Sequence, residues 1–299
     1  MHSIILHKKN YSFPSNWNDL TDKQIVAFAP LLLGPPETLV FRKASVLFYF
    51  IPGIKKYWWL HPWVVWLIKK MPRLAGKYPV LNAGQKWDLL ETVNFLFTGI
   101  SGKALLKKFR HNGFWYYLPG DNFTRESIIA FAFADEYFNN YVQGGETKFI
   151  DLMIACIARP LGSNNYPALQ FAEGDPREQF STSRTEQRAK EFYTLPHNIK
   201  TTILLYFMGS KKYIHQHYEV MFRKPVKEKQ EVEETGQQKR ISSFGKKKIP
   251  KPNFNWIGII YELSESGVFG NFDQVKNMFV HTCCYYLAKK RYEKEEQTA

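Results

Sequence analysis

The chain has 299 residues, of which 44% are hydrophobic and 16% aromatic, enough apolar surface for a substantial core, so a globular protein is expected. Three cysteines cannot form a disulfide framework, and the N-terminus does not resemble a signal peptide, which together favour a reducing cytoplasm. The net charge of +14, from 41 Lys and Arg against 27 Asp and Glu, favours polyanionic partners, nucleic acid among them, or an acidic protein surface.

The first predicted helix begins at Thr21. This residue can cap the helix, with Gln24 reaching back in a capping box and Leu20 stapling against Ile25. The helix is expected to run to about residue 33 and to end at Gly34. A second helix is predicted over 37–50, ahead of Pro52.

An aromatic helix is predicted over 57–70. The apolar run "ASVLFYFIPGIKKYWWLHPWVVWLIKK" is interrupted at 52–56 by Pro, Gly and two lysines, so no transmembrane segment is expected. Its second half could lie on a membrane surface, but large aromatic side chains pack more often in a core or against a protein partner, which we favour. The partner-binding candidates are Trp58, Trp59, Trp63 and Trp66.

Five further helices and one strand are predicted before residue 223. A helix over 82–97 is broken at 99–102, and the aromatic stretch "FWYYLPGDNFT" is the one expected strand and turn. Thr124 is expected to cap a helix that ends at 144–145, with an antiparallel neighbour over 146–158. An irregular insertion follows at about 159–182. Ser183 and Glu186 are then expected to form a capping box, and a long helix is predicted over 198–222 with a weak point at Gly209.

The composition changes abruptly at residues 223–252. Ten Lys and Arg against four Glu, with few apolar residues, predict a disordered basic linker. Its polyanion-binding candidates are Lys246, Lys247, Lys248 and Lys251. Residues 253–299 are expected to form a helical pair, the second helix capped by Asn271 and Gln274. The predicted fold is therefore mainly α: an irregular multi-helix bundle at 1–222 with a long loop insertion, a linker, and a C-terminal pair whose packing against the bundle is left open.

No recognisable active site occurs in the sequence. His215 and His217 are two residues apart and point to different faces of a helix, whereas His281 and Cys284 have metal-binding spacing but lack further ligands, which favours a core role. A phosphate loop, a nucleophile elbow and a Cys-x-x-Cys pair are all missing from the sequence. We therefore expect no enzyme, no cofactor and no metal.

The insertion contains a group of two arginines and two acids. Its members are Arg159, Asp175, Arg177 and Glu178. Two arginines and two acids can neutralise one another and hold an irregular segment against a bundle. A catalytic carboxylate pair is the alternative, but no base, nucleophile or metal ligand accompanies it in the sequence. The structural interpretation is favoured.

Several short stretches, taken in order, carry a family resemblance: "NWNDLTDKQ", "FADEYFNNYV", "LMIACIARP", "GDPREQF" and "NWIGIIYELSESGVFGNFDQVKNMFVHTCCYYLAKKR". In this order the chain resembles uncharacterised proteins encoded in tail-module gene clusters of tailed bacteriophages and prophages. The Arg159-Pro160 and 175–178 positions match that pattern, whereas the aromatic block at 57–66 has no counterpart in it.

The resemblance implies a non-enzymatic role in tail or virion assembly, as a chaperone or a structural component that binds other tail or virion proteins. The implied location is the cytoplasm of a bacterial host or the virion. Two alternatives stay open from the residues: a nucleic-acid-binding protein that uses the basic linker, and a membrane-surface protein that uses the tryptophan-rich helix. Self-association into a homo-oligomer is also left open.

Overall fold

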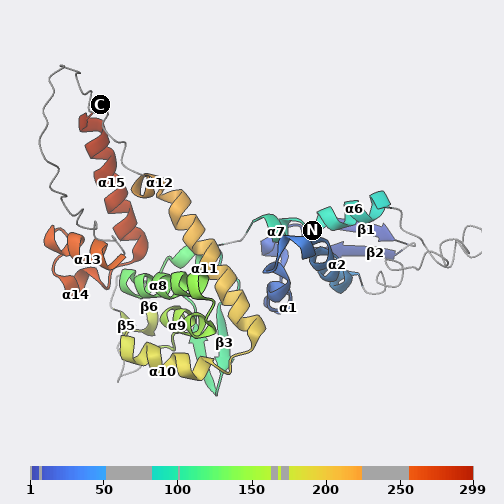
Figure 1. Ribbon diagram of the computed structural model, residues 1–299, viewed down its shortest axis with the longest axis horizontal. Coiled ribbons are helices and arrows are strands. Elements are labelled where there is room, and N and C mark those ends of the chain that lie inside the picture. Colours follow the sequence, from blue (N-terminus) through green and yellow to red (C-terminus); the bar gives the residue numbers. More distant parts are fainter. Residues whose placement is uncertain are drawn as a thin grey trace, which may run out of the picture.

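A computed structural model describes residues 2–6, 9–51, 83–99, 102–162, 168–169, 175–223 and 256–298. The protein is mainly α-helical (Figure 1), which confirms the fold class predicted from the helical spacing of the apolar residues. The tryptophan-rich segment and almost all of the basic linker lie outside the described residues.

The N-terminal elements are a β-hairpin followed by short helices. They are β1 (His2–Leu6), β2 (Lys9–Phe13), η1 (Trp17–Asp19), α1 (Asp22–Leu32), η2 (Pro36–Thr38), α2 (Leu39–Phe50), α6 (Ala83–Thr92) and α7 (Phe95–Thr98). The capping box at the start of α1 is present, since the Thr21 N–H donates to Gln24 Oε1 at 2.9 Å and the Gln24 N–H donates to Thr21 Oγ1 at 3.4 Å. The helix predicted over 82–97 is split into α6 and α7 by a turn at residues 93–94.

The expectation of a single strand region was wrong. Antiparallel pairs form between β1 and β2, between β3 (Lys108–His111) and β4 (Phe114–Tyr117), and between β5 (Ala168–Leu169) and β6 (Asp175–Glu178). The turn between β3 and β4 is Asn112-Gly113, with φ of 47° and 87°, values that suit a two-residue hairpin turn and that Asn-Gly adopts readily. This dipeptide was the sequence signal for the missed strand.

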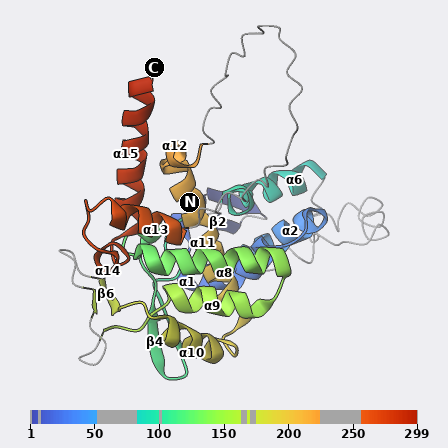
Figure 2. The ribbon, with the colours of Figure 1, turned by 60° about the vertical axis from the view of Figure 1, so that its left-hand side comes forward.

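The central elements follow the β3–β4 hairpin. They are η3 (Asp121–Phe123), α8 (Ile128–Gly144), α9 (Thr147–Ile157), α10 (Thr182–Phe192), α11 (His197–His217) and α12 (Glu219–Phe222). Helices α8 and α9 pack side by side (Figure 2), and the left-handed Gly145 separates them as expected. Gly209 lies within α11 without breaking it, and the helix ends instead at Tyr218.

Two predicted helix caps were wrong. Thr124 belongs to a turn, in which the Glu126 N–H donates to the Phe123 carbonyl, and the cap of α8 is Ser127, whose hydroxyl accepts from Ala130 N at 3.4 Å. The next helix, α10, begins at Thr182 rather than after Ser183, because the Thr185 N–H already donates to the Ser181 carbonyl.

The C-terminal elements are α13 (Trp256–Glu265), α14 (Phe272–Val275) and α15 (Val280–Thr298). The capping box of Asn271 and Gln274 is present, but it starts the one-turn α14, and α15 is a separate helix. Trp256, Ile260 and Val280 are buried in the same hydrophobic cluster as α8 and α9, so the C-terminal helices pack on the body of the protein.

The buried apolar residues form two clusters. The N-terminal cluster is built from α1, α2, α6, α7 and Leu105, and the central cluster from β3 and β4, α8 to α11 and the C-terminal helices. Helix α11 serves both, because Leu205 is buried in the N-terminal cluster while its neighbours Leu204 and Tyr206 are buried in the central one. In Figure 1 the N-terminal elements lie to the right of α11 and the central elements to its left.

Candidate functional site

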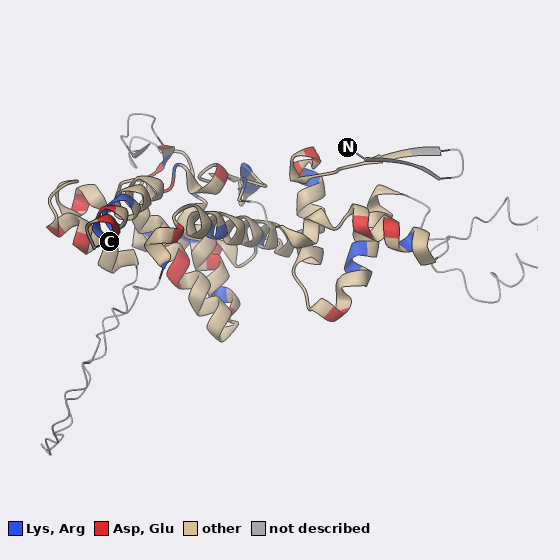
Figure 3. Cartoon of the chain, turned by 90° about the horizontal axis from the view of Figure 1, so that it is seen from above, with Lys and Arg blue, Asp and Glu red and all other residues tan. Residues whose placement is uncertain are grey.

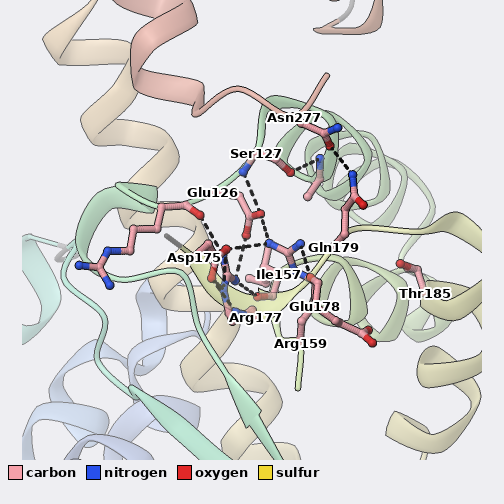
Figure 4. A network of polar contacts seen from close by, with 12 residues as sticks. Glu126, Ser127, Ile157, Arg159, Asp175, Arg177, Glu178, Gln179, Thr185 and Asn277 are labelled. Carbon is pink, nitrogen blue, oxygen red and sulfur yellow. Dashed lines mark hydrogen bonds and ion pairs between the residues drawn. The ribbon is translucent and has the colours of Figure 1, made fainter. Parts of the chain in front are cut away.

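The polar residues of the insertion form a buried ion network, shown in Figure 4. Six charged side chains, each at most 6% exposed, make it up: Glu126, Arg159, Asp175, Arg177, Glu178 and Arg188. Three carboxylates and three guanidinium groups give it no net charge. Buried charges are tolerated when they are paired and hydrogen-bonded in this way.

Arg177 is the most fully bonded member. On β6, its Nε lies 2.9 Å from Asp175 Oδ1 and its NH2 2.6 Å from Asp175 Oδ2. Its NH1 donates to Glu126 Oε2 at 3.3 Å and to the Ile157 carbonyl at 2.7 Å, and its NH2 also donates to the Arg125 carbonyl. Arg177 thus joins β6 to the end of α9 and to the residues before α8.

Arg159 supports the same joint from the other side. It leaves the C-terminal end of α9 and pairs its backbone with Tyr117 of β4, in bonds of 2.9 and 3.1 Å. Its guanidinium donates to Glu126 Oε1 at 2.5 Å, to the Glu178 carbonyl at 2.9 Å and to Asp175 Oδ2 at 3.5 Å. Glu126 is therefore shared by two arginines, and the insertion is tied to both α9 and α8.

The Glu178 carboxylate turns away from these two arginines. It pairs with Arg184 at 3.1 Å and with Arg188, both on α10. Arg188 also donates to the carbonyl of Ala155 on α9. Beyond β6, Gln179 Nε2 donates to Asn277 Oδ1 at 3.1 Å and so reaches the segment between α14 and α15. The network and Gln179 consequently connect β6 to α9, to α10 and to the segment between α14 and α15.

The network offers little to a reaction. Burial raises the pKa of Glu126, and the guanidinium groups of Arg159 and Arg177 act against that rise. Each of its three carboxylates is already held by at least one arginine, and no side chain of the network is exposed enough to meet a substrate. Its geometry is that of a structural joint.

A cleft of about 900 Å³ lies between α8, α11 and α13. Lys211 Nζ lies 2.5 Å from Asp135 Oδ1 in this cleft, and Trp256 Nε1 donates to Asp135 Oδ2 at 3.1 Å. Burial and the charge of Lys211 lower the pKa of His215, whose ring stacks on Phe222 at 4.0 Å. Asp135 is thus shared by Lys211 and Trp256, which joins α8 to α11 and to α13.

The remaining candidates for chemistry are also held in the core. His281 Nε2 donates to the Asn122 carbonyl at 2.7 Å, and its Nδ1 lies 3.0 Å from the Tyr218 hydroxyl. Cys156, Cys283 and Cys284 are buried free thiols, and burial raises the pKa of each, which disfavours the reactive thiolate. Within the described ranges, no three His, Cys, Asp or Glu side chains are grouped to hold a metal ion.

The accessible groups of interest are aromatic. Along α15, Val280, Cys283, Cys284 and Ala288 face the core, whereas Tyr285 and Tyr292 are 66% and 52% exposed. These two tyrosines are seven residues apart and Lys289 lies between them, so the three share one outward face of the helix. Figures 1 and 2 both show the C-terminal part of α15 extending beyond α8 and α13. We call this surface the α15 tyrosine face.

The structure brings together all four residues of the predicted polar cluster, although Glu178 is paired differently from Asp175. Sequence reasoning missed Glu126 and Arg188. Arg184 and Arg188, four residues apart on a helix, were a usable signal for a shared acidic partner, whereas nothing near Glu126 in the sequence marks it. The tryptophan candidates at 58–66 and the lysine candidates at 246–251 lie outside the described residues.

None of the helices in the described part of the chain combines the length and the apolar character needed to span a membrane. Comparison of the chain with protein-family models, with curated proteins and with solved structures gives no match.

Proposed function

We propose that the protein is a non-enzymatic assembly or structural protein of a phage tail or virion, which acts by binding other proteins. The tail assignment rests on the sequence resemblance, and the observation that supports protein binding is the α15 tyrosine face. Tyrosine is enriched at protein interfaces, because its ring supplies a large contact area and its hydroxyl remains satisfied in a polar surrounding. A helix that presents two such rings to solvent suits the capture of a partner.

The charge distribution along this helix supports a protein partner over a polyanion. Figure 3 shows blue and red positions together near the end marked C. Lys289 Nζ lies 3.7 Å from Glu293 Oε1, and Arg291 Nε lies 3.5 Å from Glu295 Oε1. Acidic residues therefore accompany the basic ones on this helix. The rival functions, in nucleic-acid binding and at a membrane surface, rest on the basic linker and the tryptophan-rich segment and stay as predictions.

The proposal is tested by co-expressing the protein with candidate tail proteins and purifying the complex. We expect at least one tail protein to co-purify, and Tyr285→Ala with Tyr292→Ala to reduce the recovered complex at least tenfold. Tyr193→Ala is the matched control, because Tyr193 is 77% exposed and lies at the end of α10. Equal losses from both sets of variants, or no complex with any tail protein, would contradict the proposal.

A further inference from the structure

The β3–β4 hairpin carries two cations and two aromatic rings on one face. The strands pair Lys108 with Tyr117 and Arg110 with Trp115, and side chains of directly opposite residues lie on the same face of a two-stranded sheet. The alternate pair, Phe109 and Tyr116, is buried on the other face against Phe192. Because that inner face is fixed in the core, the outer face is held rigidly toward solvent.

The rings and cations of the outer face are interleaved. Lys108 Nζ lies 4.8 Å from the ring centre of Trp115 and 5.7 Å from that of Tyr117, distances at which a cation is attracted by the ring. Trp115 is nevertheless 45% exposed, and Lys108 and Arg110 are also exposed. A second molecule can therefore reach both kinds of group at once.

Positive charge on this hairpin is not neutralised by acids. Lys107 precedes β3 and is exposed too. Among the ion pairs of the described residues, none includes Lys107, Lys108 or Arg110. The hairpin differs in this respect from α15, where cations have acidic neighbours.

We propose that the outer face of the β3–β4 hairpin binds single-stranded nucleic acid. Phosphates would pair with Lys108 and Arg110, and a base would stack on the exposed ring of Trp115, the combination by which proteins hold single strands without reading their sequence. An acidic peptide would use the cations but would leave the rings without a stacking partner. The proposal does not rest on the tail-assembly function, because it concerns a different surface and a different class of partner.

The test measures binding of a fluorescent 15-nucleotide thymidine oligomer to the full-length protein by anisotropy at low salt. We expect Trp115→Ala to weaken binding about fivefold or more, the range reported for loss of one stacked base, and Trp115→Phe to restore most of it. Arg110→Ala is expected to reduce the slope of log affinity against log salt by about 0.7, as for loss of one phosphate contact. Lys212→Ala, an exposed cation on α11, is the matched control and should bind like the parent.

The hairpin assignment is overturned if the parent protein does not bind the oligomer, or if Trp115→Ala and Arg110→Ala both bind it within twofold of the parent. Polyglutamate is the second probe. If Trp115→Ala weakens the binding of polyglutamate as much as the binding of the oligomer, the surface recognises acidic peptides and the proposal is wrong. Thermal melting of each variant checks the fold, and Lys108→Ala repeats the charge test at a second position should Arg110→Ala unfold.

Discussion

At the scale of single residues, the buried ion network makes the protein sensitive to loss of one charge. Its carboxylates are removed from water, and Glu126 depends on guanidinium donors that are 33 and 51 residues away in the chain. Removing one partner of such a group leaves an uncompensated charge in the core, which costs far more than loss of an exposed pair.

Arg177→Ala is therefore expected to lower the free energy of unfolding by about 3–5 kcal/mol, because Asp175 loses its principal partner and Glu126 loses one of two. Arg177→Lys should not restore the stability, since an ammonium group cannot reproduce the guanidinium fork. Arg184→Ala is the control. Its side chain is 25% exposed and Glu178 keeps Arg188, so the cost should be about 1 kcal/mol or less. Chemical denaturation measures both, and equal losses would contradict this account of the network.

His281 gives the stability a dependence on pH. Burial lowers its pKa from 6.5, and nearby His217 acts in the same direction while the Asn122 carbonyl opposes. A lowered pKa in the folded protein means that the unfolded chain takes up the proton more readily. The stability that depends on neutral His281 is thus complete above about pH 6.5, and it is lost as the pH falls through the pKa of His281 in the folded protein. We expect melting temperatures to fall below pH 6.5, and His281→Gln to reduce that fall. Part of the fall in melting temperature should remain in this variant, because the pKa of His215 is also lowered. A variant with an unchanged pH profile would exclude His281 as a source.

At the scale of elements, the junction of α8 and α9 depends on two adjacent glycines with different roles. Gly145 is left-handed, with φ of 70°, and its N–H donates to the Tyr141 carbonyl at 2.7 Å, whereas Gly144 is the last residue of α8. A Cβ added to either residue would meet no atom within 4 Å. Backbone conformation alone therefore separates the two positions.

Gly145→Ala is expected to destabilise the protein by about 1–2 kcal/mol, the cost of a left-handed conformation for a residue with a Cβ. Gly144→Ala should be neutral or stabilising by up to about 1 kcal/mol, because alanine favours the helix. Thermal or urea unfolding of the two variants gives a direct comparison. Destabilisation of the same size at both positions would show that space, not backbone conformation, limits this turn.

At the scale of the whole molecule, α11 is the element shared by the two hydrophobic clusters. Leu205 is 1% exposed in the N-terminal cluster and Leu204 is 6% exposed in the central cluster. Adjacent residues on one helix thus contribute to different cores, because successive side chains point about 100° apart around the helix axis.

Leu205→Ala and Leu204→Ala should therefore affect different regions. A buried Leu→Ala change costs about 2–5 kcal/mol, and we expect hydrogen exchange to accelerate in α1, α2 and α6 for Leu205→Ala and in α8 and α9 for Leu204→Ala. Native-state exchange with mass spectrometry resolves the two patterns. If both variants accelerate exchange equally throughout, the two clusters unfold as one unit.

Features that local chemistry controls could be predicted from the sequence. The mainly α fold, the capping box of α1 and the glycine end of α8 all follow from patterns within a few residues. The β3–β4 turn was equally local, and its Asn-Gly signal was passed over. The acid that faces Arg159 could not be predicted, because Glu126 is 33 residues away and reaches Arg159 through the packing of α8 on α9. The division into two clusters was likewise beyond the sequence, since it depends on where α11 is placed between them. Caps and turns form within one stretch of chain, whereas buried charge pairs and shared helices are fixed only when distant segments exclude water together.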